Sequence, residues 1–363
     1  MNNLVTALSS LGWNEDWDVQ AASFDNKERL IVRVMVEHRG AYEVSDGGSS
    51  WWAELPGRFH HTTHSRIEYP AVGDWCLCVP KAGGKLTLET ILPRRSRIVR
   101  QAAGRRAEPQ VIVSNVDTMF IVTSPNNDFS PERLQRYLAL VSHQPITPVI
   151  VLNKADLAGE IEQWISEVSD FAPDVPVVTT SALQSSPADD LAPWLGVGKT
   201  VVFVGSSGVG KSTLLNRLLV TSRQSTKDIR QGDDRGRHTT TRREMFVLPG
   251  PACHGVVIDT PGLRELTPWL GDIPVEHLGH ATQELVDQCR FADCRHRGEP
   301  GCAVQEAIAD GTLSAEALEN IHKLSDEQRA LRARTDEKAR LTKKQADKRL
   351  SRAITQFYRL RDH

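Results

Sequence analysis

The stretch VVFVGSSGVGKSTLLNRLL, residues 201–219, decides the class of fold. A β-branched run leads into a glycine-rich turn, and a helical pattern begins at Lys211. Residues 205–212 match the spacing G-x-x-x-x-G-K-[ST], in which backbone N–H groups and the positive end of the following helix surround phosphate oxygens. The stretch therefore predicts a phosphate-binding loop on an α/β sheet. The loop alone does not distinguish ATP from GTP.

The loop combines a backbone cradle with two side chains that have separate tasks. We expect Lys211 to reach the β- and γ-phosphates as a catalytic residue, and the Ser212 hydroxyl to ligate Mg²⁺. The predicted nucleotide-binding residues of the loop are Gly205, Ser206, Ser207, Gly208, Val209, Gly210, Lys211, Ser212 and Thr213.

A second signature, NKAD at residues 153–156, ends a buried strand pattern upstream of the loop. A carboxylate at Asp156 can accept two hydrogen bonds from guanine, whereas adenine would leave it desolvated and unpaired. The stem of Lys154 can lie over the base, and Asn153 would tie this segment to the phosphate loop. The sequence therefore favours GTP. The predicted base-reading residues are Asn153, Lys154, Ala155 and Asp156, with Ser181 and Ala182 after the next strand.

Residues downstream of the loop suit a metal shell and a γ-phosphate sensor. Asp259 and Gly262 belong to DTPG, which follows the strand-like GVVI; the carboxylate can hold Mg²⁺ through water, and the Gly262 N–H can sense the γ-phosphate. One of the threonines at 239–241, with Thr240 preferred, would complete the Mg²⁺ shell. Leu263 stands where Ras-like GTPases use a glutamine to orient water, and leucine cannot do so, so we predict His238 as the catalytic residue. The alternative is an ordinary exposed loop histidine.

The segment CRFADCRHRGEPGC, residues 289–302, supplies Cys289, Cys294, His296 and Cys302. Three thiolates and one imidazole make a closed tetrahedral set, which favours one structural Zn²⁺ over a catalytic ion. The alternative is a group of reduced, unliganded cysteines. Among the other cysteines, those at 76 and 78 point to one face of a strand and are expected in a core.

Composition and pattern divide the 363-residue chain into several domains. No apolar stretch is long enough to span a membrane, and the N-terminus lacks a basic region, so we expect a cytoplasmic protein with no membrane partner. Short strands with glycine turns predict a small barrel of OB type, although an SH3-like barrel fits the pattern too. Alternating strands and helices then predict a doubly wound P-loop sheet. The predicted divisions are a lead-in at 1–28, the barrel at 29–104, the P-loop domain at 105–270, and a helical zinc-binding domain with a basic C-terminal helix at 271–363.

Two basic segments are candidates for contact with nucleic acid phosphates, since the net charge of −2 gives no global attraction. Residues 94–106 hold six arginines and no acid, and we expect an exposed linker there. The run from Leu324 to the C-terminus is basic and helix-like, although a merely solvated charged face would look the same. Trp51, Trp52 and Trp75 could stack on bases if exposed, but tryptophans of small barrels are more often core.

The order of these elements is rearranged, because the base readers precede the phosphate loop and the γ-phosphate sensors follow it. The segment after Gly262 therefore runs directly into the C-terminal domain, which nucleotide state could reposition. Over residues 29–320 the chain resembles the circularly permuted RsgA/YjeQ GTPase family, in VGDW, NKAD, GSSGVGKST, GRHTTT, DTPGLREL and the cysteine cluster. The resemblance implies an OB barrel, a permuted GTPase domain, a zinc domain and a catalytic histidine at 238.

The resemblance also implies a function. It predicts a GTP hydrolase that binds GTP or GDP, the small (30S) ribosomal subunit and its 16S rRNA, assists late maturation, and hydrolyses GTP faster on the subunit. We expect a monomer. Two alternatives remain at this point: a non-hydrolysing, nucleotide-gated RNA-binding module, and a P-loop ATPase.

Overall fold

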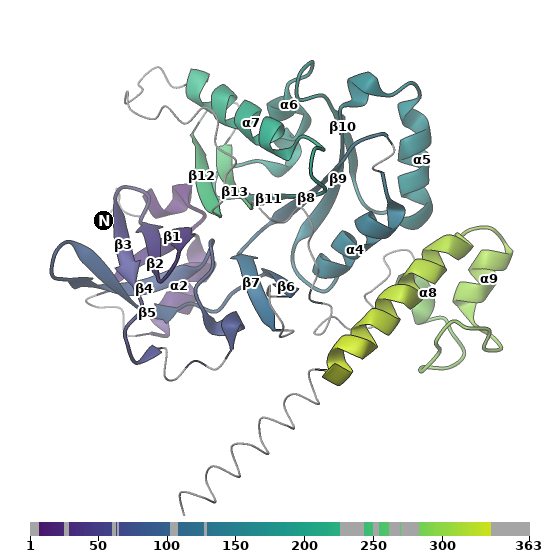
Figure 1. The fold of residues 1–363 in the computed structure, drawn as a ribbon, viewed down its shortest axis with the longest axis horizontal. Coiled ribbons are helices and arrows are strands. Elements are labelled where there is room, and N and C mark those ends of the chain that lie inside the picture. Colours follow the sequence, from purple (N-terminus) through teal and green to yellow (C-terminus); the bar gives the residue numbers. More distant parts are fainter. Residues whose placement is uncertain are drawn as a thin grey trace, which may run out of the picture.

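The computed structural model describes a set of ranges that covers most of the chain. These are residues 7–24, 29–59, 63, 65–101, 108–126, 129–225, 243–249, 254–260, 269 and 283–334. Figure 1 shows a barrel, a central sheet flanked by helices, and a helical C-terminal region beside helix α4. Among the described residues, no helix is both long and apolar enough to cross a membrane.

Five short strands close into the N-terminal barrel in the order β1-β2-β3-β5-β4, and β4 pairs back with β1. The β3–β5 pair is parallel and the others are antiparallel. Valines and leucines fill the interior, and Cys76 and Cys78 are fully buried among them, as predicted. The OB-type barrel is confirmed. The strands are β1 (Leu30–His38), β2 (Ala41–Ser45), β3 (Ser50–Glu54), β4 (Trp75–Lys81) and β5 (Lys85–Ile91), with a 3-10 turn η1 at Arg66–Glu68.

The central sheet has the order β10-β9-β8-β11-β13-β12 and is parallel except for β12 at its edge. Its strands read as continuous apolar runs because helices cover both faces. Helices α4 and α5 share one core with the sheet, and α6 and α7 share the other. The predicted doubly wound sheet is confirmed. The strands are β8 (Thr118–Thr123), β9 (Thr147–Asn153), β10 (Val177–Thr180), β11 (Thr200–Val204), β12 (Glu244–Pro249) and β13 (His254–Asp259), and the helices are α4 (Pro131–Val141), α5 (Ile161–Phe171), α6 (Pro187–Asp190) and α7 (Lys211–Ser225), with 3-10 turns η2 (Ala155–Leu157) and η3 (Ala192–Trp194).

Over residues 94–101 the arginine-rich stretch is not an exposed linker, so the prediction is wrong for this part; residues 102–106 lie outside the described residues. Strand β6 (Arg97–Gln101) pairs with β7 (Pro109–Ser114) in a separate two-stranded sheet. Arg94 forms an ion pair with the fully buried Asp74, with 2.7 Å between Nη2 and Oδ2. Apolar side chains at 98 and 99 are buried between the arginines, and their contribution to a core outweighed the basic composition. The predicted boundary between 104 and 105 lies between these two paired strands and stays a prediction.

The first described residues form a helical segment that packs on the barrel. Residues 7–10 are helical, and α2 (Glu15–Ala22) follows an Asn14 cap whose side chain accepts a hydrogen bond from the Trp17 N–H. Trp13 and Trp17 are buried against Trp75 of β4, with Trp13 edge-on to Trp75 at 4.8 Å between ring centroids. This lead-in therefore completes a core rather than lying loosely on the surface.

The C-terminal region contains α8 (Gln283–Val286), α9 (Ala303–Ala309) and a longer helix over residues 315–334. The long helix begins nine residues before the predicted start at Leu324. It lies beside α4 (Figure 1), where Ile321 and Leu324 are buried with Ala139. An ion pair of 2.8 Å between Arg136 Nη1 and Glu327 Oε2 flanks this contact. The C-terminal region is thus packed on the helix that covers the phosphate-loop sheet.

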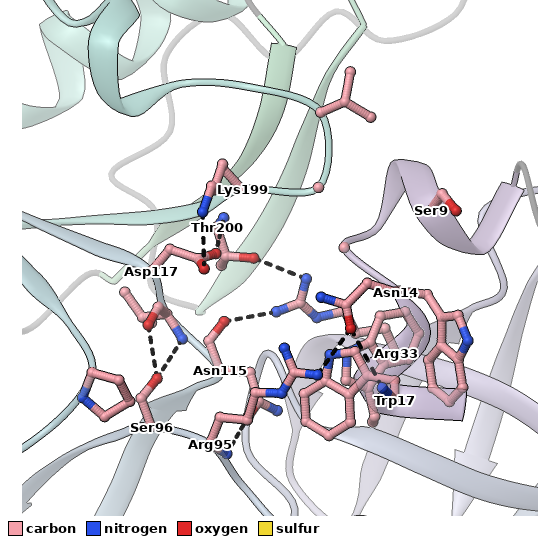
Figure 2. Close-up of a pocket in the computed structure, with 17 residues that line it drawn as sticks. Ser9, Asn14, Trp17, Arg33, Arg95, Ser96, Asn115, Asp117, Lys199 and Thr200 are labelled. Carbon is pink, nitrogen blue, oxygen red and sulfur yellow. Dashed lines mark hydrogen bonds and ion pairs between the residues drawn. The ribbon is translucent and has the colours of Figure 1, made fainter. Parts of the chain in front are cut away.

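Barrel and central sheet are joined at β1 and β12, where Val36 pairs with Glu244, so the strands form one eleven-stranded sheet. Below this junction a cavity of about 370 Å³ separates α2, the barrel and the amino ends of β8 and β11 (Figure 2). Arg33 of β1 lies in its wall, only 1% exposed. Its guanidinium donates to Gly73 O (3.1 Å), Asn115 O (3.1 Å), Thr200 Oγ1 (3.0 Å) and Leu11 O. One side chain thereby connects the lead-in, the barrel and the sheet.

Candidate nucleotide site and metal cluster

The glycine-rich loop follows β11, and two of its glycines are required by close backbone approaches. Gly205 has φ +138°, and a Cβ there would lie 2.1 Å from the carbonyl oxygen of Val122 in β8. Gly210 has φ +98°, and a Cβ there would lie 2.2 Å from Asn153 Nδ2. A larger residue at either position would push the loop away from the neighbouring strands. The loop is therefore held tightly against the edge of the sheet.

Lys211 is the first residue of α7, and its ammonium curls back over the loop. Its Nζ donates to the carbonyl oxygens of Gly205 (2.7 Å) and Ser206 (2.5 Å). Ser212 and Thr213 are exposed on the first turn of the same helix. The helix N-terminus and three polar side chains thus open to solvent at one place, which is an arrangement suited to an anion.

Asn153 joins three of the predicted segments through one buried amide. Its Nδ2 donates to Val209 O in the phosphate loop (2.7 Å), and its Oδ1 accepts from the Ala182 N–H (3.2 Å). The geometry places the residues from NKAD, the loop and the Ser181-Ala182 segment together because the carboxyl ends of β9, β10 and β11 meet at one edge.

The two charged residues of NKAD lie beside this amide. Lys154 adopts a left-handed conformation (φ +64°) and its Nζ donates to Gly208 O at 2.7 Å. Asp156 follows in the short η2 turn with Ala155, and its side chain is exposed to solvent. An exposed carboxylate next to a phosphate loop can accept hydrogen bonds from a ligand without first breaking a protein contact.

Asp259 ends β13, the strand that pairs in parallel with β11. The next residue, Thr260, donates through Oγ1 to Phe203 O of β11 at 3.4 Å. The Asp259 carboxylate is half-buried at the same edge as the phosphate loop. Gly262, His238 and the threonines at 239–241, Thr240 included, lie outside the described residues, so their predicted roles stay predictions.

Two arginines at this edge were missed from sequence. Arg133, in the first turn of α4, donates through Nη1 to Ser206 Oγ in the phosphate loop. Arg217 of α7 donates to Ala182 O (2.8 Å) and to Leu183 O (3.2 Å). The position of Arg133 follows from the strand order: β8 lies next to β11, and this brings the start of the helix after β8 beside the loop. Without that strand order the residue looks like any basic residue on a helix.

The Cys/His segment folds into a compact cluster. The ligand atoms of Cys289, Cys294, His296 and Cys302 all lie within 4.8 Å of one another. Cys289 Sγ is 4.0 Å from Cys302 Sγ, and His296 Nδ1 is 3.3 Å from Cys302 Sγ. Tetrahedral Zn²⁺ with Zn–S near 2.3 Å and Zn–N near 2.0–2.1 Å would separate its donors by about 3.5–3.8 Å. The four residues fit one structural Zn²⁺.

Neighbouring groups order the cluster and set its protonation. Glu299 accepts from the Arg297 N–H (2.7 Å) and the Arg295 N–H (3.2 Å), which fixes the turn that carries His296. Burial raises the pKa of Cys294 to about 12 with the help of neighbouring thiols, against the lowering effect of the His296 N–H, whereas burial lowers the pKa of His296. A neutral imidazole can bind a metal directly, while the thiols must lose their protons when the ion binds.

The three tryptophans proposed for base stacking differ in exposure. Trp75 is fully buried in the core between the lead-in and the barrel, which confirms the packing alternative and excludes stacking there. Trp51 is half-buried, and Trp52 is 46% exposed with its ring 4.7 Å from that of His38. Trp52 is therefore the exposed aromatic of this group.

The permuted order of the loops on a P-loop sheet, together with a Cys₃His cluster, defines a circularly permuted nucleotide-binding protein with a metal-binding C-terminal region. The family model described as RsgA GTPase matches residues 91–269. A small ribosomal subunit biogenesis GTPase RsgA of Methanosarcina acetivorans is 43% identical over 321 residues, covering 87% of this chain and 84% of that protein. RsgA 2 of Lactiplantibacillus plantarum is 40% identical over 342 residues, covering 94% and 96%. This chain belongs to the RsgA GTPase family.

Solved structures agree with this assignment. YjeQ from Thermotoga maritima aligns with a TM-score of 0.62 at 28% identity, over 83% of this chain and 98% of that one. YloQ, described as a circularly permuted GTPase, aligns with a TM-score of 0.60 at 26% identity, over 84% and 97%. Membership of the family confirms the predicted fold class of barrel, permuted P-loop domain and zinc-binding C-terminal region.

Proposed function

We propose that the chain hydrolyses GTP and acts in the biogenesis of the small ribosomal subunit. The observation that carries the proposal is the buried Asn153 amide, which joins the base-reading segment to the phosphate loop across a permuted sheet. Relatives named small ribosomal subunit biogenesis GTPases, similar over nearly the whole chain, support the subunit as partner.

The side chains at the carboxyl edge of the sheet divide the work of binding GTP. The exposed Asp156 would accept hydrogen bonds from guanine, with the Lys154 stem over the base and the Ser181-Ala182 backbone beside it. Lys211 would exchange its loop carbonyls for β- and γ-phosphate oxygens, while the loop N–H groups cradle them. Ser212 and Asp259 would hold Mg²⁺, which neutralises charge on the phosphates. The remaining roles, Thr240 as metal ligand, Gly262 as γ-phosphate sensor and His238 as the residue that orients water, complete the proposal.

The C-terminal cluster would hold one Zn²⁺ as a structural ion, since three thiolates and an imidazole leave no open coordination position. The proposal also covers the binding partner, the oligomeric state and the cellular location. We propose contact with the rRNA of the subunit, a monomeric protein and a cytoplasmic location, because assembling subunits are found there.

Base identity is the first test. Asp156→Asn replaces an acceptor with a donor, so it should weaken GTP binding by about 10²-fold or more and favour xanthine, which carries a carbonyl in place of the 2-amino group. Asp174→Asn is a matched control, because Asp174 is an exposed acid before β10, away from the loops. Equal GTP affinity in both variants, or tighter binding of ATP than GTP by the unaltered protein, would overturn the assignment of guanine.

Turnover is the second test. Phosphate release from GTP is measured with purified small subunits, with large subunits and with neither. We expect slow release that rises with small subunits only. Stimulation by both subunits alike would contradict the partner, and binding of GTP without release under all conditions would favour a nucleotide-gated binding module.

A further inference from the structure

One face of strand β1 packs in the barrel, and the other face packs against the P-loop domain. Val32 and Val34 are buried in the barrel core. The alternate residues face outward: Arg33 bonds to Thr200 and Asn115, and Met35 packs against the core shared with the central sheet. A β-bulge between Val34 and Val36 then interrupts the alternation, and Glu37 lies opposite Tyr42 of β2. A strand with two buried faces transmits its position to both neighbours.

Glu37 forms the polar contact at the place where the two sheets join. Its Oε2 lies 2.5 Å from Arg243 Nη1, and the Arg243 side chain is only 14% exposed. One residue along on each strand, Val36 pairs with Glu244 of β12. A partly buried ion pair of this kind is screened less than a surface pair, so it fixes the start of β12 against the barrel.

The same row of the sheet leads to the nucleotide edge. Glu244 stands opposite Val36 on one side and opposite Asp259 on the other. Asp259 ends β13, which pairs in parallel with β11, the strand that leads into the phosphate loop. The barrel strand is thus two strands away from the carboxylate proposed for Mg²⁺, in direct register.

A second cation increases the importance of Glu37. Arg100 of β6 is half-buried nearby, where burial and then the Arg243 guanidinium lower its pKa, while Glu37 opposes the shift. Removing the carboxylate would leave two guanidinium groups facing each other in a partly buried place. Repulsion between them would act on Arg243 and hence on the first residues of β12.

We propose that Glu37 is a positioning residue for GTP hydrolysis: through Arg243 it holds the start of β12, and with it the Asp259 end of β13, at the distance from the phosphate loop that turnover requires. The barrel, 200 residues earlier in sequence, thereby sets the geometry of the metal-binding edge. This inference rests on the proposed GTPase function. It makes the position of the barrel, and whatever binds the barrel, a determinant of the hydrolysis rate.

The test is steady-state GTP hydrolysis by the full chain with and without small subunits. Glu37→Gln should lower kcat by about 5- to 10-fold in both conditions and change KM less than 2-fold, because the defect is in geometry at the phosphates rather than in base binding. The charge swap Glu37→Arg with Arg243→Glu should restore kcat to within about 2-fold, since it rebuilds the pair beside Arg100. Glu89→Gln is the matched control: Glu89 pairs with Arg29 at 3.0 Å within the barrel and is similarly buried.

Three results would overturn the inference: an unchanged kcat in Glu37→Gln, an equal loss in Glu89→Gln, or a charge swap as impaired as the single variants with an unchanged thermal midpoint. If Glu37→Gln does not fold, Arg243→Lys keeps the charge and shortens the reach, and an unchanged kcat there contradicts the inference equally. Failure of the proposed function itself looks different, because the unaltered protein would then release no phosphate from GTP.

Discussion

The two ends of the central sheet use their charged side chains in opposite ways. At the carboxyl end, Asp156 is exposed and Lys211 rests on backbone carbonyls that it can leave. At the amino end, Arg33 is buried and its guanidinium donates to four neutral oxygen atoms. Figure 2 shows two of these contacts, with Asn115 and Thr200. A charge that is to bind a ligand must be weakly held, whereas a charge that joins domains must be fully satisfied.

The amino end also shows how burial changes the pKa of such a cation. Burial lowers the pKa of Arg33 to about 10, although Asp117 and Asp74 oppose the shift. The group stays charged at neutral pH, and Arg95 nearby stacks over Trp17 at 4.2 Å. The carboxyl end is therefore expected to govern activity, and the amino end to govern the stability of the domain arrangement. Four changes test that contrast.

The largest effect should come from Lys211→Ala. Loss of the ammonium removes its contact with the β- and γ-phosphates, so we expect kcat/KM for GTP to fall by about 10²–10³-fold with little change in stability. Lys199→Ala is the control, since Lys199 lies at the amino end of β11 against Asp117. Similar losses in the two lysine variants would remove the functional difference between the two ends.

The next effect should come from Arg33→Met, which keeps an unbranched apolar stem and deletes the charged guanidinium. We expect the free energy of unfolding to fall by about 3 kcal/mol, because buried oxygen atoms lose their hydrogen-bond donor. Recovery of the desolvation cost of the cation offsets only part of this loss. The urea unfolding midpoint is the measurement. Arg29→Met, which breaks a partly exposed pair with Glu89, should lower the free energy of unfolding by less than about 1 kcal/mol. A more stable Arg33→Met protein would contradict the reading of Arg33 as a domain connector.

A smaller, local effect is expected from metal removal, because the Cys/His cluster is compact and none of its four residues belongs to the loops that are proposed to bind the nucleotide. Chelation or Cys302→Ser should lower the thermal stability of the C-terminal region and leave GTP affinity within about 2-fold. The raised pKa of Cys294 means that protons compete with the ion for this sulfur. Zinc release should therefore increase as pH falls and decrease as pH rises, as measured with a chromophoric chelator. Release independent of pH would contradict thiolate ligation.

The smallest effect should come from Arg133→Ala at the carboxyl end. The Ser206 side chain loses one partner while the rest of the loop keeps its own contacts, so we expect GTP affinity to fall by about 3- to 5-fold. Arg136→Ala, one turn further along α4, breaks only the pair with Glu327 and should leave GTP affinity unchanged. Equal affinities in both variants would show that α4 does not support the loop.

The contacts that the sequence interpretation did not predict have one physical origin. The arginines at 94–106 read as a linker by composition, yet Ile98 and Val99 between them supply apolar contacts that only a partner strand can bury. The lead-in before residue 29 has no local sequence signal for its partner, yet Trp13 and Trp17 complete a cluster around Trp75. In each case the partner lies far along the chain, so no local window contains the information.

The sequence by itself determined the glycine-rich loop and the Cys/His cluster and predicted the guanine-reading motif, because each needs particular residue types at short, fixed spacings. Tertiary structure alone decided that Arg33 would be buried among three segments, that Arg133 would contact the loop, and that β1 would pair with β12. Those contacts depend on which strands become neighbours, and strand order follows from the packing of the whole sheet rather than from any single stretch of residues.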